Sequence, residues 1–137
     1  MKKIGVMTSF FVMCFFTAIT IANPLINAGQ KTVIRVSADQ PRFTIRLKSN
    51  PTTGYSWFLR DYDASLIQPI QHSFITETHT HLMGAPGYEQ WTFRVLPHAF
   101  VASQPMTMRF VYMRPWEHEN KTESVVFTII PKRHRSA

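Results

Sequence analysis

Residues 42–47 have the sequence Arg-Phe-Thr-Ile-Arg-Leu, in which every second residue is apolar. Phe43, Ile45 and Leu47 therefore fall on one side of an extended chain, and polar residues fall on the other. Residues 106–112, Met-Thr-Met-Arg-Phe-Val-Tyr, show the same alternation. A period of two is typical of a β-strand with one face buried in a core and the other face in water.

The alternation recurs along most of the chain. It appears at Ile34 and Val36, Tyr55–Leu59, His72–Thr78, Trp91–Val95 and Val125–Ile129. With the two segments above, this makes about seven short strands separated by turn-rich loops. No segment shows a convincing helical period. The pattern predicts an all-β fold, an antiparallel β-sandwich.

Length and composition are those of one globular domain. The chain has 137 residues, of which 45% are hydrophobic, and a formal net charge of +7. This size is sufficient for a hydrophobic core without metal or disulfide staples. The positive charge means that an anionic surface or partner must be considered.

The N-terminus has the features of a secretory signal peptide. Lys2 and Lys3 form a short basic start, and residues 4–21 form an uncharged, strongly apolar stretch. Small residues allow cleavage after Ala22 or after Ala28. The alternative is an uncleaved anchor helix, because the apolar stretch is at the lower limit of what spans a bilayer.

The signal peptide and the domain divide the chain into residues 1–28 and residues 29–137. Cys14, the single cysteine, is removed with the signal peptide, which excludes thiol catalysis, thiolate metal sites and intramolecular disulfides in the remaining chain. We expect a secreted or periplasmic protein with no stable membrane insertion after cleavage.

Three loops stand out between the expected strands. The first has the sequence Asn50-Pro51-Thr52-Thr53-Gly54-Tyr55. Pro51 restricts its own φ and favours an extended Asn50, and Gly54 permits a positive φ. We therefore expect a stiff loop with two small hydroxyl residues at its tip. An ordinary strand connection is the alternative interpretation.

The second loop has the sequence Leu82-Met83-Gly84-Ala85-Pro86-Gly87-Tyr88. The pair Pro86-Gly87 predicts a type II turn, in which the glycine takes a positive φ. The apolar Leu82 and Met83 stand just before this pair. They are either presented to a partner or form the end of a strand tucked into the core.

The third loop has the sequence Met113-Arg114-Pro115-Trp116-Glu117. Trp and Arg are the residue types most enriched at binding hot spots. The guanidinium of Arg114 is expected to stack on the indole of Trp116, with Pro115 limiting the freedom of the backbone. The alternative is a Trp116 buried in the core beside a solvated Arg114.

The order and spacing of these loops resemble the chagasin family of cysteine-peptidase inhibitors. The resemblance covers essentially the whole chain after the signal peptide, and the first and third motifs are close to the family form over several consecutive residues. Pro86 is a mild departure, since some members carry glycine there. The resemblance implies an immunoglobulin-like antiparallel β-sandwich of about seven strands. It also implies reversible, non-covalent inhibition of papain-like cysteine peptidases.

Carried over by motif, the resemblance implies that the three loops form a wedge that enters the active-site cleft. Thr52 would lie beside the catalytic cysteine and histidine of the peptidase. The segment 82–84 would run along the non-primed side, where papain-like enzymes have an apolar pocket, and Arg114 and Trp116 would pack on the primed side. The expected peptidase-binding residues are Asn50, Pro51, Thr52, Thr53, Gly54, Tyr55, Leu82, Met83, Gly84, Ala85, Pro86, Gly87, Arg114, Pro115 and Trp116. The expected partner is a papain-like cysteine peptidase, bound by a monomer without cofactor or metal.

A periplasmic metal-binding sandwich is one alternative function. On a strand, His79 and His81 would share one face, and Met106 and Met108 are further ligand types. The histidines are better explained as exposed polar residues, and the two methionines as part of the apolar core.

A cationic adhesion or anion-binding module is the other alternative. The basic residues are spread over several expected strands on outward faces, where solvated charge is the usual explanation. Nucleic-acid binding is not expected, because most aromatic residues face inward. No enzyme is expected either, because the sequence lacks Gly-x-Ser-x-Gly, His-Glu-x-x-His and a phosphate-binding glycine loop.

Overall fold

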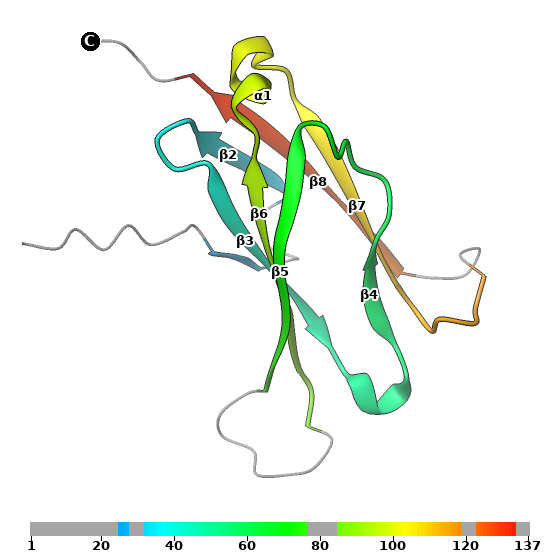
Figure 1. Cartoon of the computed structure of the whole chain (residues 1–137). Coiled ribbons are helices and arrows are strands. Elements are labelled where there is room, and N and C mark those ends of the chain that lie inside the picture. Colours follow the sequence, from blue (N-terminus) through cyan, green and yellow to red (C-terminus); the bar gives the residue numbers. More distant parts are fainter. Residues whose placement is uncertain (1–24, 28–31, 77–84, 119–122, 134–137) are drawn as a thin grey trace, which may run out of the picture.

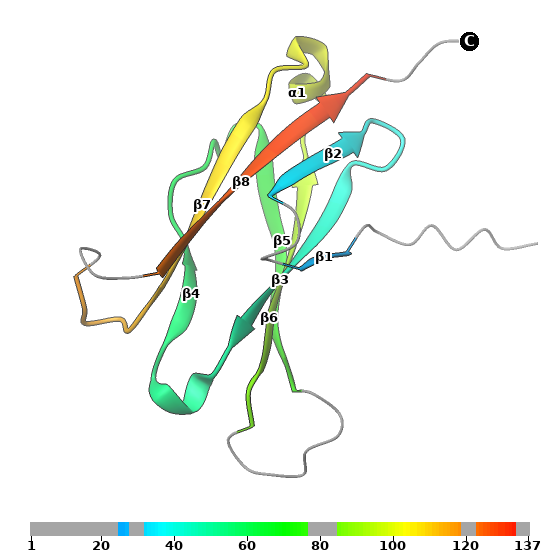
Figure 2. The ribbon, with the colours of Figure 1, turned by 180° about the vertical axis from the view of Figure 1, so that it is seen from behind.

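The protein is a sandwich of two four-stranded β-sheets, seen from opposite sides in Figures 1 and 2. The computed structural model describes residues 25–27, 32–76, 85–118 and 123–133. The first sheet has the order β1 (Leu25–Asn27), β3 (Arg42–Ser49), β6 (Gly87–Val95) and β5 (Ile67–Thr76). The second has the order β2 (Val33–Ser37), β8 (Glu123–Lys132), β7 (Met106–Met113) and β4 (Ser56–Leu59).

The N-terminal part of the domain is divided between the two sheets. β1 pairs parallel with β3, and β2 pairs parallel with β8, whereas the four other strand pairings are antiparallel. The all-β prediction is therefore confirmed, with two parallel pairings at the sheet edges. β1 lies before Ala28 and was not expected, since this part of the sequence was assigned to the signal peptide.

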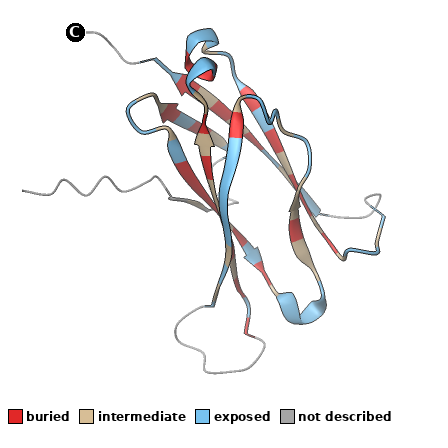
Figure 3. Ribbon diagram, in the orientation of Figure 1, coloured by how far each residue is buried: buried red, intermediate tan, exposed pale blue. Residues whose placement is uncertain are grey.

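The core is built from the alternating residues that the sequence singled out. Phe43, Phe93, Phe110 and Phe127 are fully buried, one on each of the four strands β3, β6, β7 and β8. Their rings form a continuous series with centroid separations of 5.4, 6.1 and 5.9 Å. The contact between Phe93 and Phe110 joins the two sheets edge to face, a favoured geometry for aromatic rings. Figure 3 shows the buried residues between the layers.

One short helix, α1 (Pro97–Ala102), corrects the expectation that no helix would form. Pro97 stands in its first turn, where a missing N–H costs nothing, and Ser103 ends it with a φ of 49°. Six residues are too few to show a helical period in the sequence. Among the described residues, no helix is long and apolar enough to cross a membrane.

The type II turn predicted at Pro86-Gly87 is wrong, because Gly87 is the first residue of β6. Gly87 does not have the positive φ that a type II turn requires, and it lies in register with both Ser49 on β3 and Thr76 on β5. A Cβ atom added to Gly87 would lie 2.3 Å from the carbonyl oxygen of Ile75. Glycine is needed here for close approach of two strands.

We expect Gly87→Ala to destabilise the protein by about 2–3 kcal/mol, because the new methyl group meets backbone that cannot rotate away. Gly54→Ala is the comparison variant. Its added Cβ would lie 3.7 Å from its nearest neighbours, so that only the left-handed φ of 78° opposes it, at about 1 kcal/mol. Urea unfolding of both variants measures the difference. A cost at Gly87 no greater than that at Gly54 would contradict the close approach.

Candidate functional site

The first loop is a tightly wound turn at one end of the sandwich. It forms η1 (Pro51–Thr53), a single 3₁₀ turn between β3 of one sheet and β4 of the other. The N–H of Gly54 donates to the carbonyl of Pro51 at 3.0 Å, and the φ of Gly54 is 78°. Asn50 has an extended backbone with a φ of −129°, as its position before proline predicts. The expected backbone geometry is therefore confirmed.

The two threonine hydroxyls of this loop are both oriented by Asn50. The hydroxyl of Thr52 donates to the side-chain oxygen of Asn50 at 2.6 Å, and that of Thr53 donates to its backbone carbonyl at 2.7 Å. Both threonines are exposed. Each hydroxyl oxygen at the tip consequently keeps free lone pairs that can accept a hydrogen bond from a partner.

The third loop packs against the first. Its backbone closes a turn, in which the N–H of Glu117 donates to the carbonyl of Arg114 at 3.0 Å. The Nε of Arg114 donates to the carbonyl of Thr53 at 3.0 Å. Its guanidinium carbon lies 4.7 Å from the ring centre of Tyr55. The expected cation–π contact of Arg114 therefore forms with Tyr55, across the loops, and not with Trp116.

Glu117 completes this contact between the loops. Its carboxylate lies 3.5 Å from the guanidinium of Arg114 and accepts a hydrogen bond from the hydroxyl of Tyr55 at 3.3 Å. Arg114 is thus held by a carboxylate, a carbonyl and an aromatic face together. Glu117 was not among the predicted site residues, although it lies three residues after Arg114, the spacing at which a turn brings two side chains together.

Trp116 is the most exposed large apolar side chain among the described residues, with 72% of its surface accessible. Its indole lies next to Gly54, since a Cβ added to that glycine would be 3.7 Å from the Cη2 atom of Trp116. The alternative of a core tryptophan is therefore wrong. A large ring left in water at the tip of a loop is typical of a binding surface.

The second loop leaves the sandwich at the same end. β5 and β6 run side by side to Thr76 and Gly87, and these two strand ends lie toward the η1 end of the molecule (Figure 1). Gly87 is also the register partner of Ser49, which immediately precedes the first loop. Ala85 is buried and Pro86 is exposed. Leu82, Met83 and Gly84 lie outside the described residues, so their predicted role stays a prediction.

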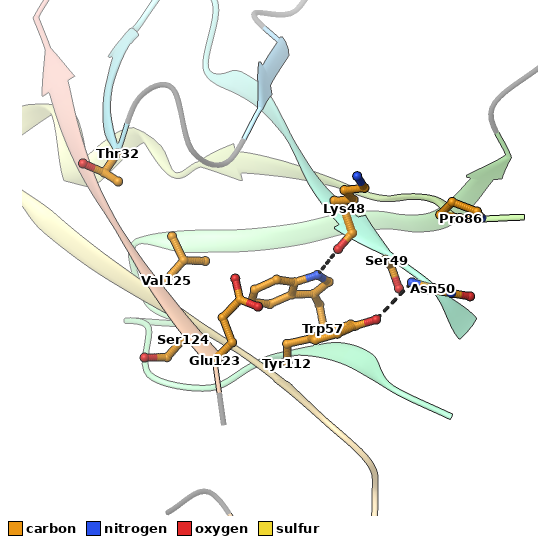
Figure 4. Close-up of a pocket in the computed structure, with 10 residues that line it drawn as sticks. All are labelled: Thr32, Lys48, Ser49, Asn50, Trp57, Pro86, Tyr112, Glu123, Ser124 and Val125. Atoms are coloured by element: carbon orange, nitrogen blue, oxygen red, sulfur yellow. Dashed lines mark hydrogen bonds between the residues drawn. The ribbon is translucent and has the colours of Figure 1, made fainter. Parts of the chain in front are cut away.

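Tyr112 on β7 holds the base of the first loop. Its hydroxyl accepts a hydrogen bond from the backbone N–H of Asn50 at 3.0 Å (Figure 4). Its ring packs against Tyr55 and Trp57 with centroid separations of 5.3 and 5.0 Å. The indole N–H of Trp57 donates in turn to the carbonyl of Lys48 at 2.9 Å. This aromatic cluster joins the two sheets directly below the loops.

A buried carboxylate lies deeper at the same end. Glu89 is 4% exposed and accepts hydrogen bonds from the hydroxyl of Ser49 at 2.8 Å and the backbone N–H of Trp57 at 3.1 Å. His72 of β5 lies 3.0 Å from its second oxygen. A buried polar group is costly unless it is hydrogen-bonded, and these three contacts satisfy the carboxyl group of Glu89. Glu89 was not among the predicted site residues, although alternation places it on the same face as Phe93.

A cavity of about 520 Å³ lies beside this cluster, between the ends of β3 and β8 (Figure 4). Asn50 and Pro86 are the only predicted site residues among those that line it. The other predicted residues of the first and third loops lie outside this cavity. Their exposed tips form a protruding surface, unlike the concave sites that bind small molecules.

The metal-binding alternative finds no support in the described part of the chain. No group of three or more His, Cys, Asp or Glu side chains there is arranged to hold a metal ion. Met106 and Met108 are buried in the core, as expected. His79 and His81 lie outside the described residues.

Fold and site together define a β-sandwich binding protein that presents a rigid, protruding group of loops. The model of the chagasin family peptidase inhibitor I42 matches residues 24–130. The chain therefore belongs to the chagasin family, whose members inhibit cysteine peptidases and are not enzymes. No curated protein matches the chain closely enough to be counted.

Three solved structures of similar fold cover most of the chain. The cysteine protease inhibitor EhICP2 from Entamoeba histolytica is 20% identical with a TM-score of 0.66, over 80% of this chain and 95% of that one. Amebosin is 17% identical with a TM-score of 0.62, over 81% and 99%. PbICP-C in complex with falcipain-2 is 13% identical with a TM-score of 0.60, over 80% and 100%. At these identities the similarity shows the shared fold.

We expect Tyr112→Phe to lower the free energy of unfolding by about 1 kcal/mol, because it removes the acceptor for the N–H of Asn50 and keeps the ring. Tyr88→Phe is the matched control, since the hydroxyl of Tyr88 has no hydrogen-bond partner within the described segments. Thermal unfolding measures both. Equal stability of the two variants would show that the hydroxyl of Tyr112 does not hold the loop.

Proposed function

We propose that the protein inhibits papain-like cysteine peptidases reversibly, as a monomer, by inserting its three loops into the active-site cleft. The single observation that carries the proposal is the contact of Arg114 with both Thr53 and Tyr55. It joins the first and third loops into one surface before any partner binds. Pre-organisation of this kind lowers the entropy cost of association.

The backbone of the first loop explains why it would resist cleavage. A peptidase acts on a chain that lies extended in its cleft, whereas Pro51–Thr53 is wound into a 3₁₀ turn. The hydrogen bonds of Asn50 to Thr52 and Thr53 oppose unwinding. The loop therefore fills the cleft without presenting a peptide bond to the nucleophile.

The Thr52 hydroxyl suits the polar centre of such a cleft. Its hydrogen is donated to Asn50, so its oxygen is available as an acceptor. In a cysteine peptidase the active thiolate is paired with a protonated histidine, which is a donor. We expect the Thr52 oxygen to accept from that imidazolium, and the exposed Trp116 to supply apolar contact on the primed side.

The second loop completes the proposed wedge. Gly87, at its base, is the register partner of Ser49, which immediately precedes the first loop. The apolar Leu82 and Met83 suit the apolar pocket on the non-primed side. One solved neighbour of the same fold was determined in complex with falcipain-2, which supports a peptidase as the partner of this chain too.

Titration of papain with the purified protein, followed with a fluorogenic substrate, tests the proposal and the role of Trp116 together. We expect reversible inhibition at roughly nanomolar concentration by the unmodified protein. Trp116→Ala should weaken it by about 30- to 700-fold, since hot-spot truncations cost roughly 2–4 kcal/mol. Stability should not change, because the indole is largely exposed.

Val101→Ala is the matched control for Trp116→Ala. Val101 is 67% exposed and lies in α1, at the opposite end of the sandwich (Figure 1). We expect it to leave inhibition unchanged. Equal inhibition by the two variants would show that Trp116 does not contribute to binding of the peptidase. A folded protein without effect on papain at micromolar concentration would contradict the inhibitor proposal for papain itself.

We also propose that the protein is secreted or periplasmic and that its signal peptide is cut after Ala22. Cleavage after Ala28 would remove β1, the strand that pairs with residues 44–46 of β3. The family match begins at residue 24, which supports the earlier cut. Intact-mass measurement of the exported protein should find Asn23 at the N-terminus. A mature chain that begins at Gly29 would contradict this choice.

A further inference from the structure

A second cavity, of about 440 Å³, opens at the end of the sandwich opposite to the loops. It lies where β3 and β6 meet the chain that leads into α1, whereas η1 is at the far end (Figure 1). Neither the three loops nor the aromatic cluster below them contributes to its lining. Any ligand bound here would leave the proposed peptidase-binding surface free.

Two arginines line this cavity side by side. Arg42 of β3 and Arg94 of β6 are register partners in an antiparallel pair. Like charges directly opposite each other across a sheet are destabilising. Within the described residues, neither guanidinium has a hydrogen bond, an ion pair or an aromatic ring as partner. The pair is an uncompensated concentration of positive charge.

Three other arginines of the described chain have a charged or polar side chain as partner. Arg109 pairs with Asp61, Arg46 donates to the side chain of Gln90 at 2.9 Å, and Arg114 pairs with Glu117. No acidic side chain lines the cavity. Asp39, close by in the sequence, interacts with the hydroxyl of Ser37 at 3.3 Å. Among the described residues Arg35 also lacks a countercharge, but its register partner is Ile130. Two arginines that face each other without a countercharge distinguish this cavity.

The rest of the lining is apolar. Pro41, Val95, Pro97 and Phe100 contribute to it, and Val95 and Phe100 are buried. Arg133 holds this wall in place, because its Nε donates to the carbonyl of Phe100 at 3.3 Å and its terminal nitrogen donates to that of Val101. A volume of this size is within the range of small-ligand sites.

We infer that this cavity binds a small amphiphilic carboxylate, such as the anion of a medium-chain fatty acid. The carboxylate would lie between the guanidinium groups of Arg42 and Arg94, for which planar two-oxygen anions are the best-matched partners. The aliphatic tail would lie against the accessible part of the apolar lining, where Pro41 is half-buried and Pro97 is exposed. Binding would remove the repulsion between the arginines and cover these prolines at the same time.

Isothermal calorimetry with octanoate on the purified protein tests this inference. Acetate carries the charge without the tail, and 1-octanol carries the tail without the charge. We expect saturable one-to-one binding of octanoate, at least about tenfold tighter than either probe. Acetate or inorganic phosphate binding as tightly as octanoate would show a general anion site and overturn the inference. An absence of octanoate binding would overturn it too.

The variant Arg42→Gln should weaken octanoate binding by at least about tenfold. Its thermal midpoint should not fall, because the substitution removes a like-charge contact. Arg35→Gln, on β2 of the other sheet, makes the same charge change outside the cavity and should bind octanoate as the unmodified protein does. Equal loss in both variants would assign the effect to net charge and refute the site. Papain inhibition should be unchanged by octanoate, so the two proposals fail independently.

Discussion

The edge-to-face contact between Phe93 and Phe110 is the interaction on which the rest of the molecule depends. It is the point at which the aromatic series from Phe43 to Phe127 passes from one sheet to the other. The first loop joins a strand of each sheet, so its geometry is determined by how the sheets are stacked. Because protein interiors are close-packed, one sheet has little freedom to slide over the other. Core packing therefore holds the two ends of the loop in a constant relationship.

Polar contacts carry this rigidity from the core to the tips. Glu89 binds three neighbouring strands at the base of the loops, and Tyr112 ties the first loop to β7. Arg114 then joins the first loop to the third. Each step uses a group that is partly or fully removed from water, where an unmade hydrogen bond is expensive. A binding surface that is ordered before association has less entropy to lose when it meets its partner.

Strands with a regular alternation were predicted well from the sequence, because a period of two follows directly from the geometry of an extended chain with one buried face. Elements without that period were missed: β1 is too short to show it, and α1 is less than two turns long. β5 was predicted only from His72 onward, because most of the strand is exposed on both faces. Gly87 was assigned to a turn because Pro-Gly pairs favour one. It is required for close strand contact, which local sequence does not reveal.

The sequence by itself determined the sandwich class, the position of the three loops and the backbone geometry of the first, because alternation, proline and glycine act locally. It also indicated the family, through the order of the loop motifs. Only the tertiary structure decided which side chains meet. Arg114 stacks on Tyr55 and not on Trp116, Glu89 is buried at the base of the loops, and Arg42 stands against Arg94. These contacts join residues far apart in the chain, and they depend on strand register and sheet stacking, which no local pattern specifies.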